Sequence, residues 1–219
     1  MRSTVDRMTV DSGTAPTRLE RRKERTRQAM IDAAKRIVAE RGTVSVTITE
    51  ITDEADVGFG SFYNHFESKH ELFEIALTEV LEDYGQALDR ACEELVDPAE
   101  RYAVGVRMSA RLPFERPAVA QVLVQANAEH LTAEQGLPMR ALRDIGQGLD
   151  AGRFTLGDAQ LGLMLTVGGC LEFIRAAMAQ PEEFTTEDAD SLAAMLLRAL
   201  GMSGPDADEI ADRALPVVG

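Results

Sequence analysis

The chain has 219 residues, of which 45% are hydrophobic and 27% charged, and its formal net charge is −14. This length is enough for one large or two small domains with hydrophobic cores. The longest uncharged stretch, the 13 residues from Ala159 to Leu171, is too short to span a bilayer, and we expect no signal sequence. Cys92 and Cys170 show neither CxxC spacing nor clustered histidines. We therefore expect a reduced, cytoplasmic setting without membrane association, metal or cofactor.

The acidic residues are unevenly distributed along the chain. Residues 1–69 hold 12 Lys/Arg against 11 Asp/Glu, a net charge of +1, and the remaining residues carry −15. DNA binding requires a basic face, not a basic protein. The distribution therefore allows DNA contact at the amino-terminal end and disfavours it elsewhere.

Residues 1–16 are polar and aperiodic and are predicted to form a disordered amino-terminal arm. A capping box of Thr17 and Glu20 then predicts a helix that continues to Arg41 and ends at Gly42. The first half of this helix is basic, and its second half carries an apolar stripe. A basic run alone is usually a solvated helix face.

The next segment predicts two short helices with a tight turn between them. Thr47 and Glu50 form a capping box that begins the first helix. Gly58, in the turn, can take backbone angles that other residues resist. The second helix, about seven residues long, places Phe62 and Phe66 on its inner face. Two such helices form a helix-turn-helix, whose second helix can enter the DNA major groove.

The rest of the chain is predicted to be helical. A capping box at Ser68 and Glu71 begins a long amphipathic helix that ends near Pro98. No alternating strand pattern appears, so the predicted fold class is all-α. Further helices are predicted at residues 99–112, 117–130, 138–151, 158–179 and 187–201, with prolines at several starts or breaks.

The stretch ITEITDEADVGFGSFYNHFESKHELF resembles the amino-terminal DNA-binding domain of tetracycline-repressor (TetR) family regulators. The resemblance covers about residues 20–75 and is most specific from Gly60 to Lys69. Asp56 stands where a turn glycine is commoner and Thr52 where an alanine is usual, and both can be accommodated. The resemblance implies a three-helix helix-turn-helix domain at residues 17–67 and a larger helical ligand-binding and dimerisation domain at 68–203. The acidic composition after Gly204 predicts a loosely held tail at 204–219, with a helical turn or more near 208–215.

The short groove-facing helix limits which side chains can reach base edges. Hydroxyls of Ser61 and Thr49 can meet several bases, and the edge of Phe59 can meet a thymine methyl. Gly60 allows close backbone approach. Two alternatives stay open: Ser61 as a mere helix-start residue and Tyr63 as a half-buried packing residue.

Other positions match phosphate-contacting positions of TetR-type regulators, and helix starts favour phosphate because their free N–H groups point outward. Immediately before a helix-turn-helix, the basic run also favours phosphate contact. The predicted DNA-binding residues are Arg22, Arg25, Thr47, Thr49, Phe59, Gly60, Ser61, Tyr63, Asn64, His65 and Lys69.

The helix at residues 158–179 is apolar nearly all round from Leu161 to Leu171, which indicates burial on more than one side. The pair Gly168–Gly169 costs about 1 kcal/mol per glycine relative to alanine, which close approach of another helix would offset. In TetR-type regulators the last two long helices form a four-helix bundle across a two-fold axis. The alternative is a monomer whose final helices pack on each other. The predicted dimer-interface residues are Leu161, Leu165, Gly168, Leu192 and Leu196.

The resemblance also implies a small-molecule pocket in the carboxy-terminal domain. Residues 117–130 mix valine and leucine with glutamine and asparagine, as apolar ligand sites with polar anchors do, but an ordinary helical core has the same composition. The candidate ligand-binding residues are Tyr102, Arg107, Met108, Gln121, Gln125 and Asn127.

Enzyme function is not expected. The sequence contains no GxSxG, P-loop or HExxH motif, and no strand precedes Gly58–Phe59–Gly60 to make a dinucleotide-binding turn. We predict a homodimeric repressor that a small apolar ligand releases from a palindromic DNA operator. The alternative is a helical small-molecule-binding or interaction protein that dimerises but does not regulate transcription by induction.

Overall fold

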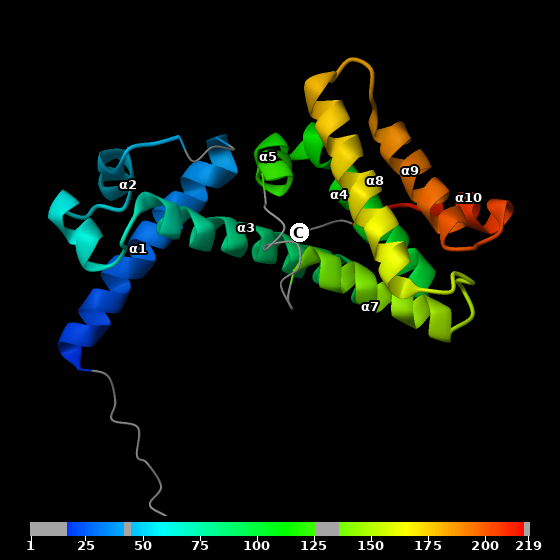
Figure 1. The fold of residues 1–219 in the computed structure, drawn as a ribbon, viewed down its shortest axis with the longest axis horizontal. Coiled ribbons are helices and arrows are strands. Elements are labelled where there is room, and N and C mark those ends of the chain that lie inside the picture. The colour runs from blue at the N-terminus through cyan, green and yellow to red at the C-terminus, as the bar shows by residue number, and fades with distance from the viewer. Residues whose placement is uncertain (1–16, 42–44, 126–135, 217–219) are drawn as a thin grey trace, which may run out of the picture.

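The computed structural model describes residues 17–41, 45–125 and 136–216, and all regular elements in these ranges are helices. Figure 1 shows an elongated molecule in which α1, α2 and η1 form one end, which we call the head. The other end, the body, consists of α4 to α10, and the long helix α3 joins the two. The helices are α1 (Arg18–Arg41), α2 (Ile48–Glu54), the 3₁₀ helix η1 (Phe59–Asn64), α3 (Lys69–Ala91), α4 (Pro98–Glu115), α5 (Pro117–Gln125), α7 (Leu137–Asp150), α8 (Ala159–Ala179), α9 (Thr186–Ala199) and α10 (Gly204–Asp212).

The start of α2 has the predicted capping chemistry. The Thr47 hydroxyl accepts from the Glu50 amide at 3.2 Å, and the Glu50 carboxylate accepts from the Thr47 amide at 2.8 Å. The bond from the Thr47 amide lowers the pKa of Glu50, and so does the Thr47 hydroxyl, which donates to the same carboxylate at 2.8 Å. At α3 the box is only half formed, because the Glu71 carboxylate accepts from the amide of Glu67 instead of that of Ser68.

The turn between α2 and η1 differs from the prediction. Gly58 has extended angles, φ −67° and ψ 139°, which any residue adopts. The residue with positive φ is Asp56, at 52°. Aspartate tolerates this left-handed region better than most residues because its short polar side chain can hydrogen-bond locally. Asp56, which replaces the common turn glycine, thus occupies the position of this turn whose positive φ favours glycine most.

One hydrophobic cluster extends from the head into the body. Phe62 and Phe66 of the head belong to the same cluster as Val122 of α5 and Ile174 of α8, and α3 supplies its middle from Leu72 to Leu88. Direct contacts between α1 and α5 add to this connection. The predicted boundary at residues 67–68 therefore separates two parts that share a core.

A second cluster fills the body between α4, α8, α9 and α10. The sequence suggested a loose tail after residue 203, with helix near 208–215. Instead α10 begins at Gly204, where the Ser203 hydroxyl accepts from the Asp206 amide at 3.4 Å. Ala207 and Ile210 of α10 are buried in the second cluster, because the apolar residues of this acidic helix share one face.

Two predicted helix ends are also wrong. The long helix α3 ends at Ala91 rather than near Pro98. Helix α4, predicted to end before Pro113, continues through it to Glu115. A proline this close to a helix end disturbs few backbone hydrogen bonds, so it does not terminate the helix. The predicted arm at residues 1–16 lies outside the described residues.

Candidate DNA-binding and ligand-binding sites

Helix η1 has a buried and an exposed aromatic face. Phe62 and Phe66 are buried, with ring centroids 5.6 Å apart. Phe59 and Tyr63 are 51% and 60% exposed and meet edge to face at 6.3 Å. This exposure disfavours the alternative in which Tyr63 is a half-buried packing residue. The buried pair thus anchors a helix whose outer side presents two aromatic rings to solvent.

The other predicted DNA-contacting residues of the head lie at the surface to different degrees. Ser61 is partly buried, and its amide donates to the Gly58 carbonyl at 2.8 Å as the first bond of η1. Its role as a helix-start residue is therefore compatible with the structure. Those that are exposed are Arg22, Arg25, Thr47, Thr49, Gly60 and Asn64.

Lys69 and His65 lie at the junction of the head with α3, and both are partly buried. The Lys69 ammonium donates to the Val46 carbonyl at 2.7 Å, which ties the start of α3 to the start of α2. An ammonium has three donors, so two remain for other acceptors. Burial, together with Lys23 and Arg27, lowers the pKa of His65. His65 is therefore neutral at neutral pH and can donate an N–H without adding charge.

Helices α8 and α9 expose apolar side chains. Leu161, Met164 and Leu165 of α8 and Met195 of α9 are each more than half exposed. Gly168 is also exposed, with open space where a side chain would be. We call these five residues the α8–α9 face.

The two remaining predicted dimer residues pack inside the protomer. Leu196 is only 8% exposed and belongs to the second cluster, against which Leu192 also packs. A Cβ added at Gly169 would contact Leu196 at 3.5 Å, so the close helix approach expected at the paired glycines occurs at Gly169 within one chain. The prediction for Leu196 as an interface residue is therefore not supported by its position.

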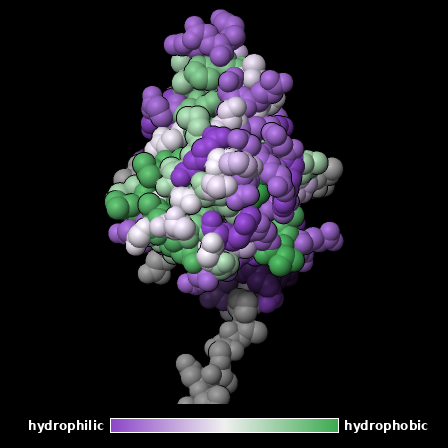
Figure 2. Space-filling view, turned by 90° about the vertical axis from the view of Figure 1, so that its right-hand side faces the viewer, coloured by the Kyte–Doolittle hydropathy of each residue, from purple (hydrophilic) through white to green (hydrophobic). Residues whose placement is uncertain are grey.

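The apolar character of α8 also raises the question of a membrane span. Among the described residues, α8 is the one helix long and apolar enough to cross a membrane by length and composition, and 28% of its apolar window is buried. A single helix of this kind argues weakly for a membrane span, since core helices of other proteins meet the same criterion. Viewed from the end of the body, the surface is largely hydrophilic at its centre, with apolar areas toward its edges (Figure 2).

A cavity of about 100 Å³ lies among α3, α4, α5, α7 and α8 in the body. Part of its wall is apolar, from Leu88, Val106, Leu123, Val167 and Leu171. The polar part of the wall consists of Asp89, Cys92, Arg101, Tyr102, Ser109, Arg140, Arg143, Asp144, Thr166 and Cys170. An apolar cavity with a few polar groups is the usual form of a small-molecule site.

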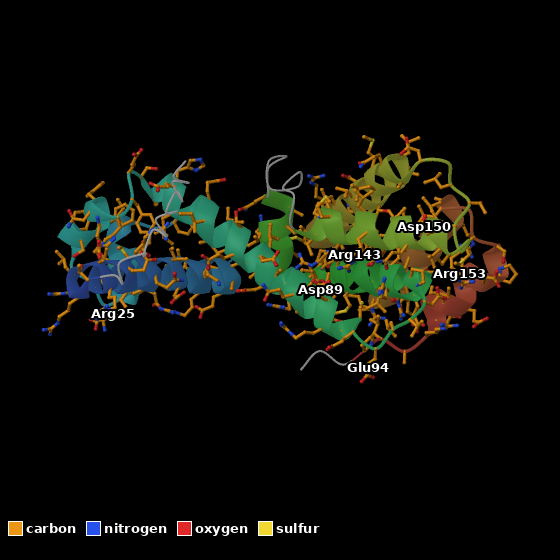
Figure 3. The ribbon with its side chains drawn as sticks, turned by 90° about the horizontal axis from the view of Figure 1, so that it is seen from below. Arg25, Asp89, Glu94, Arg143, Asp150 and Arg153 are labelled. Atoms are coloured by element: carbon orange, nitrogen blue, oxygen red, sulfur yellow. The ribbon has the colours of Figure 1, made fainter. Side chains whose placement is uncertain are left out.

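A charged cluster joins α3 to α7 at this wall. Arg140 donates through Nε to Asp89 at 2.7 Å and through Nη2 to Glu82 at 2.9 Å. Arg143 donates to Asp89 at 3.2 Å and through Nε to Asp144 at 3.1 Å. Asp89 and Arg143 lie next to each other where the two helices meet (Figure 3). Arg140 thus pairs with Glu82 and Asp89, and Arg143 pairs with Asp89 and Asp144, so Asp89 is shared by the two arginines.

Uncharged polar groups occupy another part of the wall. The Thr166 hydroxyl donates to the Gly162 carbonyl at 2.8 Å, so the Tyr102 hydroxyl, 2.7 Å away, donates to Thr166. Burial raises the pKa of Tyr102, and it raises the thiol pKa of Cys92 to about 11 and of Cys170 to about 12. Both thiols are therefore protonated at neutral pH and are weak nucleophiles. Among the described residues, no group of three or more histidines, cysteines or acids could hold a metal ion.

Among the predicted ligand residues that the structure describes, only Tyr102 lines this cavity. Arg107 instead donates to Asp190 of α9 at 2.8 Å and to the Arg213 carbonyl at 2.6 Å, so its charge holds helices together. Met108 packs against the first cluster. Gln121 is partly buried and Gln125 exposed, and neither lines the cavity; Asn127 lies outside the described residues.

The charged wall was missed in the sequence although α7 carries a signal for it. Arg140 and Asp144 are four residues apart, so they share a helix face with Leu137 and Ala141, which also line the cavity. Asp144 is buried, and burial raises its pKa despite the opposing effect of Arg143. Charged residues at apolar-face positions are thus the pattern that could have indicated the site.

Comparisons with known proteins bear on both parts of the chain. The family model described as "Bacterial regulatory proteins, tetR family" matches residues 30–76, and "Tetracyclin repressor-like, C-terminal domain" matches residues 97–213. The solved structure of RolR in complex with resorcinol is 34% identical, with a TM-score of 0.77, over 91% of this chain and 99% of RolR. RolR without ligand gives a TM-score of 0.72 over 88% of this chain and 100% of RolR, also at 34% identity.

Among curated proteins, the HTH-type transcriptional regulator HbdR of Aromatoleum sp. (strain CIB) is 36% identical over 78 residues. These residues are 36% of this chain and 34% of HbdR. This chain therefore matches about a third of the length of that relative, whereas the similarity to RolR extends over head and body together.

Proposed function

Because this chain belongs to the TetR family of DNA-binding transcriptional regulators, we propose that it is a homodimeric repressor that a small, single-ring ligand releases from a palindromic operator. The proposal has three parts: a DNA interface in the head, a dimer interface on α8 and α9, and a ligand site in the body. The main support for this proposal is the charged wall of the cavity. This wall is formed jointly by α7 and by α3, and α3 begins at the head, so one helix contacts both proposed sites.

In the proposed DNA complex, the exposed side of η1 enters the major groove. Phe59 and Ser61, with Thr49 of α2, read base edges, and Gly60 permits close approach. The N-terminal part of α1 and the starts of α2 and α3 contact phosphates, where charge and free amides favour anions. The proposed phosphate contacts are Arg22, Arg25, Thr47, Tyr63, Asn64, His65 and Lys69.

The α8–α9 face supports the proposed dimer. An exposed cluster of leucine and methionine on two adjacent helices raises the free energy of the protein in water, and burial against a second chain lowers it. The exposed Gly168 leaves room for close approach of a second helix. A two-fold axis at this face would give each dimer two heads, matching half-sites about one helical turn, roughly 34–36 Å, apart or slightly more.

The cavity supports a neutral aromatic ligand. Its volume of about 100 Å³ is of the order of one small ring. Arg140 and Arg143 already face Glu82, Asp89 and Asp144, so the wall does not demand a charged ligand. RolR, which is similar over nearly its whole length, is described in complex with resorcinol, a dihydroxybenzene. We therefore propose a hydroxylated single-ring compound as effector.

The proposed route from ligand to DNA passes through Arg140. This arginine of α7 holds Glu82 and Asp89 on α3 and also lines the cavity. Displacement of its guanidinium by a ligand would loosen α3 from α7, and the other end of α3 carries Lys69 and packs on the head. A ligand shifts this equilibrium only as far as its affinities for the two arrangements differ, typically by about 1–3 kcal/mol.

A mobility-shift experiment tests the proposal. DNA from upstream of the gene should be retarded by the purified protein at low salt, and added resorcinol should reverse the shift. DNA of the same length with a scrambled sequence should bind only weakly. If no upstream fragment shifts specifically, the repressor function is wrong; if DNA binds but no single-ring phenol releases it, the ligand class is wrong.

A further inference from the structure

Lys35 of α1 joins the head to the middle of α3. Its ammonium donates to the Glu79 carboxylate at 3.1 Å and lies 2.8 Å from Asp83 Oδ2. Glu79 and Asp83 are four residues apart, so they share one face of α3 and lie about one turn from each other. Helices α1 and α3 cross and contact each other (Figure 1). One cation of the head thus holds two successive turns of the helix that continues into the body.

A second cation holds the same part of α3 from the side of the body. Arg140 of α7 donates to Glu82 at 2.9 Å and to Asp89 at 2.7 Å. Glu82 directly precedes Asp83 in the sequence, so the carboxylates that bind the two cations alternate within about three turns of one helix. Helix α3 is therefore fixed to the head by Lys35 and to the body by Arg140 over the same stretch.

The contacts of Lys35 define a geometry and contribute little stability. The Lys35 side chain is 22% exposed, and those of Glu79 and Asp83 are 36% and 61% exposed. Ion pairs near the surface are worth about 0–1 kcal/mol. The apolar contacts between α1 and α3 hold the helices together but are not directional, whereas a charge-assisted hydrogen bond requires a defined geometry. Bonds to two carboxylates one turn apart therefore determine how α3 lies against α1.

We propose that Lys35 is a positioning residue for the ligand response: its bonds to α3 make the head move with α3 when Arg140 is displaced. Without these bonds, α3 can shift against α1 over the apolar contacts, and the head keeps the arrangement that fits the operator. Lys35 does not line the cavity and is not among the residues proposed to contact DNA, so it acts through α3. This inference rests on the proposed function, because it names the residue that passes a change at Arg140 to the head.

A double-mutant cycle on operator binding tests this role without a ligand. In Gly85→Ala the added methyl would lie 2.6 Å from Arg140 Cζ, which displaces the guanidinium. Operator affinity is measured for the full-length wild type, Gly85→Ala, Lys35→Met and the double variant. We expect Gly85→Ala to weaken operator binding about fivefold or more in the wild-type background, and by less than about twofold in the Lys35→Met background. Methionine retains most of the apolar stem of lysine, so Lys35→Met should fold.

The matched control is Arg36→Met, at the next position of α1. Arg36 donates to Glu54 of α2 at 2.8 Å, so its ion pair lies within the head. In the Arg36→Met background, and in that of the charge-preserving Lys35→Arg, Gly85→Ala should weaken operator binding as much as in the wild type. A merely structural role for Lys35 would change the operator affinity with and without Gly85→Ala by the same factor, so the ratio would stay at its wild-type value.

The other results separate this inference from the proposed function. An equal effect of Gly85→Ala with and without Lys35 would overturn the inference and leave the proposed function intact. No effect of Gly85→Ala in the wild-type background would overturn both the inference and the proposed route through Arg140. Absence of specific operator binding by the wild type would overturn the proposed function and the inference that rests on it. If Lys35→Met does not fold, Glu79→Gln combined with Asp83→Asn removes the same bonds from the side of α3 and takes its place in the cycle.

Discussion

The head and the body present their polar groups in opposite ways. In the head, most of the groups proposed to act are exposed, and hydrogen bonds that shape them join near neighbours, such as Thr47 and Glu50. In the body, Arg140 reaches Asp89 and Glu82, which are 51 and 58 residues away in sequence, at the wall of a cavity. The head is thus suited to a large, fixed, charged partner, and the body to a small partner that competes with internal ion pairs.

The shared core links the two regions despite this contrast. Helix α3 belongs to the core of the head and carries the carboxylates that hold Arg140 in the body. A change in the cavity therefore has a physical route to the head.

The α8–α9 face should separate dimerisation from folding. Leu165→Glu places a charge on a side chain that is half exposed in the protomer, so the chain should fold but sediment as a monomer and lose operator binding. Leu196→Glu buries an unpaired charge in the second cluster and should lower the free energy of unfolding by several kcal/mol. Sedimentation together with thermal unfolding distinguishes the two. A fully dimeric Leu165→Glu protein would contradict the proposed interface.

The link through Arg140 should be broken by Gly85→Ala. The added methyl would lie 2.6 Å from Arg140 Cζ, so the guanidinium must leave its seat between Glu82 and Asp89. Alanine favours helix by about 1 kcal/mol over glycine, so α3 should persist. Because this displacement mimics the proposed action of the ligand, we expect weaker operator binding without ligand, and the further effect of ligand on it should shrink from about 1–3 kcal/mol toward zero.

Gly146→Ala in α7 is the matched control, because its methyl would meet open space. Operator titrations with and without resorcinol provide the measurement. Equal ligand effects in the two variants would show that Arg140 is not the link.

Phosphate and base contacts in the head should differ in salt dependence. Lys69→Ala should weaken binding to all DNA sequences and reduce the salt slope by about 1, because one fewer counterion is released. Tyr63→Ala should also weaken all sequences, through loss of a hydrogen bond to phosphate. Ser61→Ala should instead change which operator sequences are preferred. An unchanged salt slope in Lys69→Ala would limit this residue to its internal bond with Val46.

Substitutions in the turn of the head should change stability only modestly. Asp56→Val puts a branched side chain at φ 52° and should cost about 1–2 kcal/mol of stability. Gly58→Ala should be neutral or slightly stabilising, because its φ of −67° suits alanine and no atom lies within 4 Å of the added methyl. Thermal unfolding of both variants provides the comparison. A more harmful Gly58→Ala would show that the glycine itself is needed.

The same contrast between head and body explains what could be predicted from the sequence. The all-α fold, the start of α2 and the inward side of η1 depend on residues three or four apart, and those predictions are confirmed. The prediction for the turn was wrong, because it assigned the unusual backbone angles to Gly58, whereas Asp56 adopts the positive φ. The DNA-contacting roles of individual residues stay predictions.

The cavity could not be predicted in the same way. Its wall combines Asp89 of α3, Arg101 of α4 and Asp144 of α7, and no local pattern relates positions on three helices. Arg107, chosen as a polar residue on an apolar helix, is instead held by Asp190 of α9. Leu196, chosen from its helical spacing, faces inward because α9 also has to cover α4. Helix periodicity identifies an apolar face but does not say which partner buries it.

If ligand and operator binding are coupled, the coupling must act in both directions. Thermodynamic linkage requires DNA to weaken the ligand by the same factor by which the ligand weakens DNA. Resorcinol should therefore be titrated calorimetrically into the free dimer and into the dimer saturated with operator. We expect about 5- to 150-fold weaker binding of resorcinol to the operator complex than to the free dimer, equal to the loss of operator affinity at saturating ligand. Equal affinities in the two titrations would contradict it, leaving a DNA-binding protein that resorcinol does not induce.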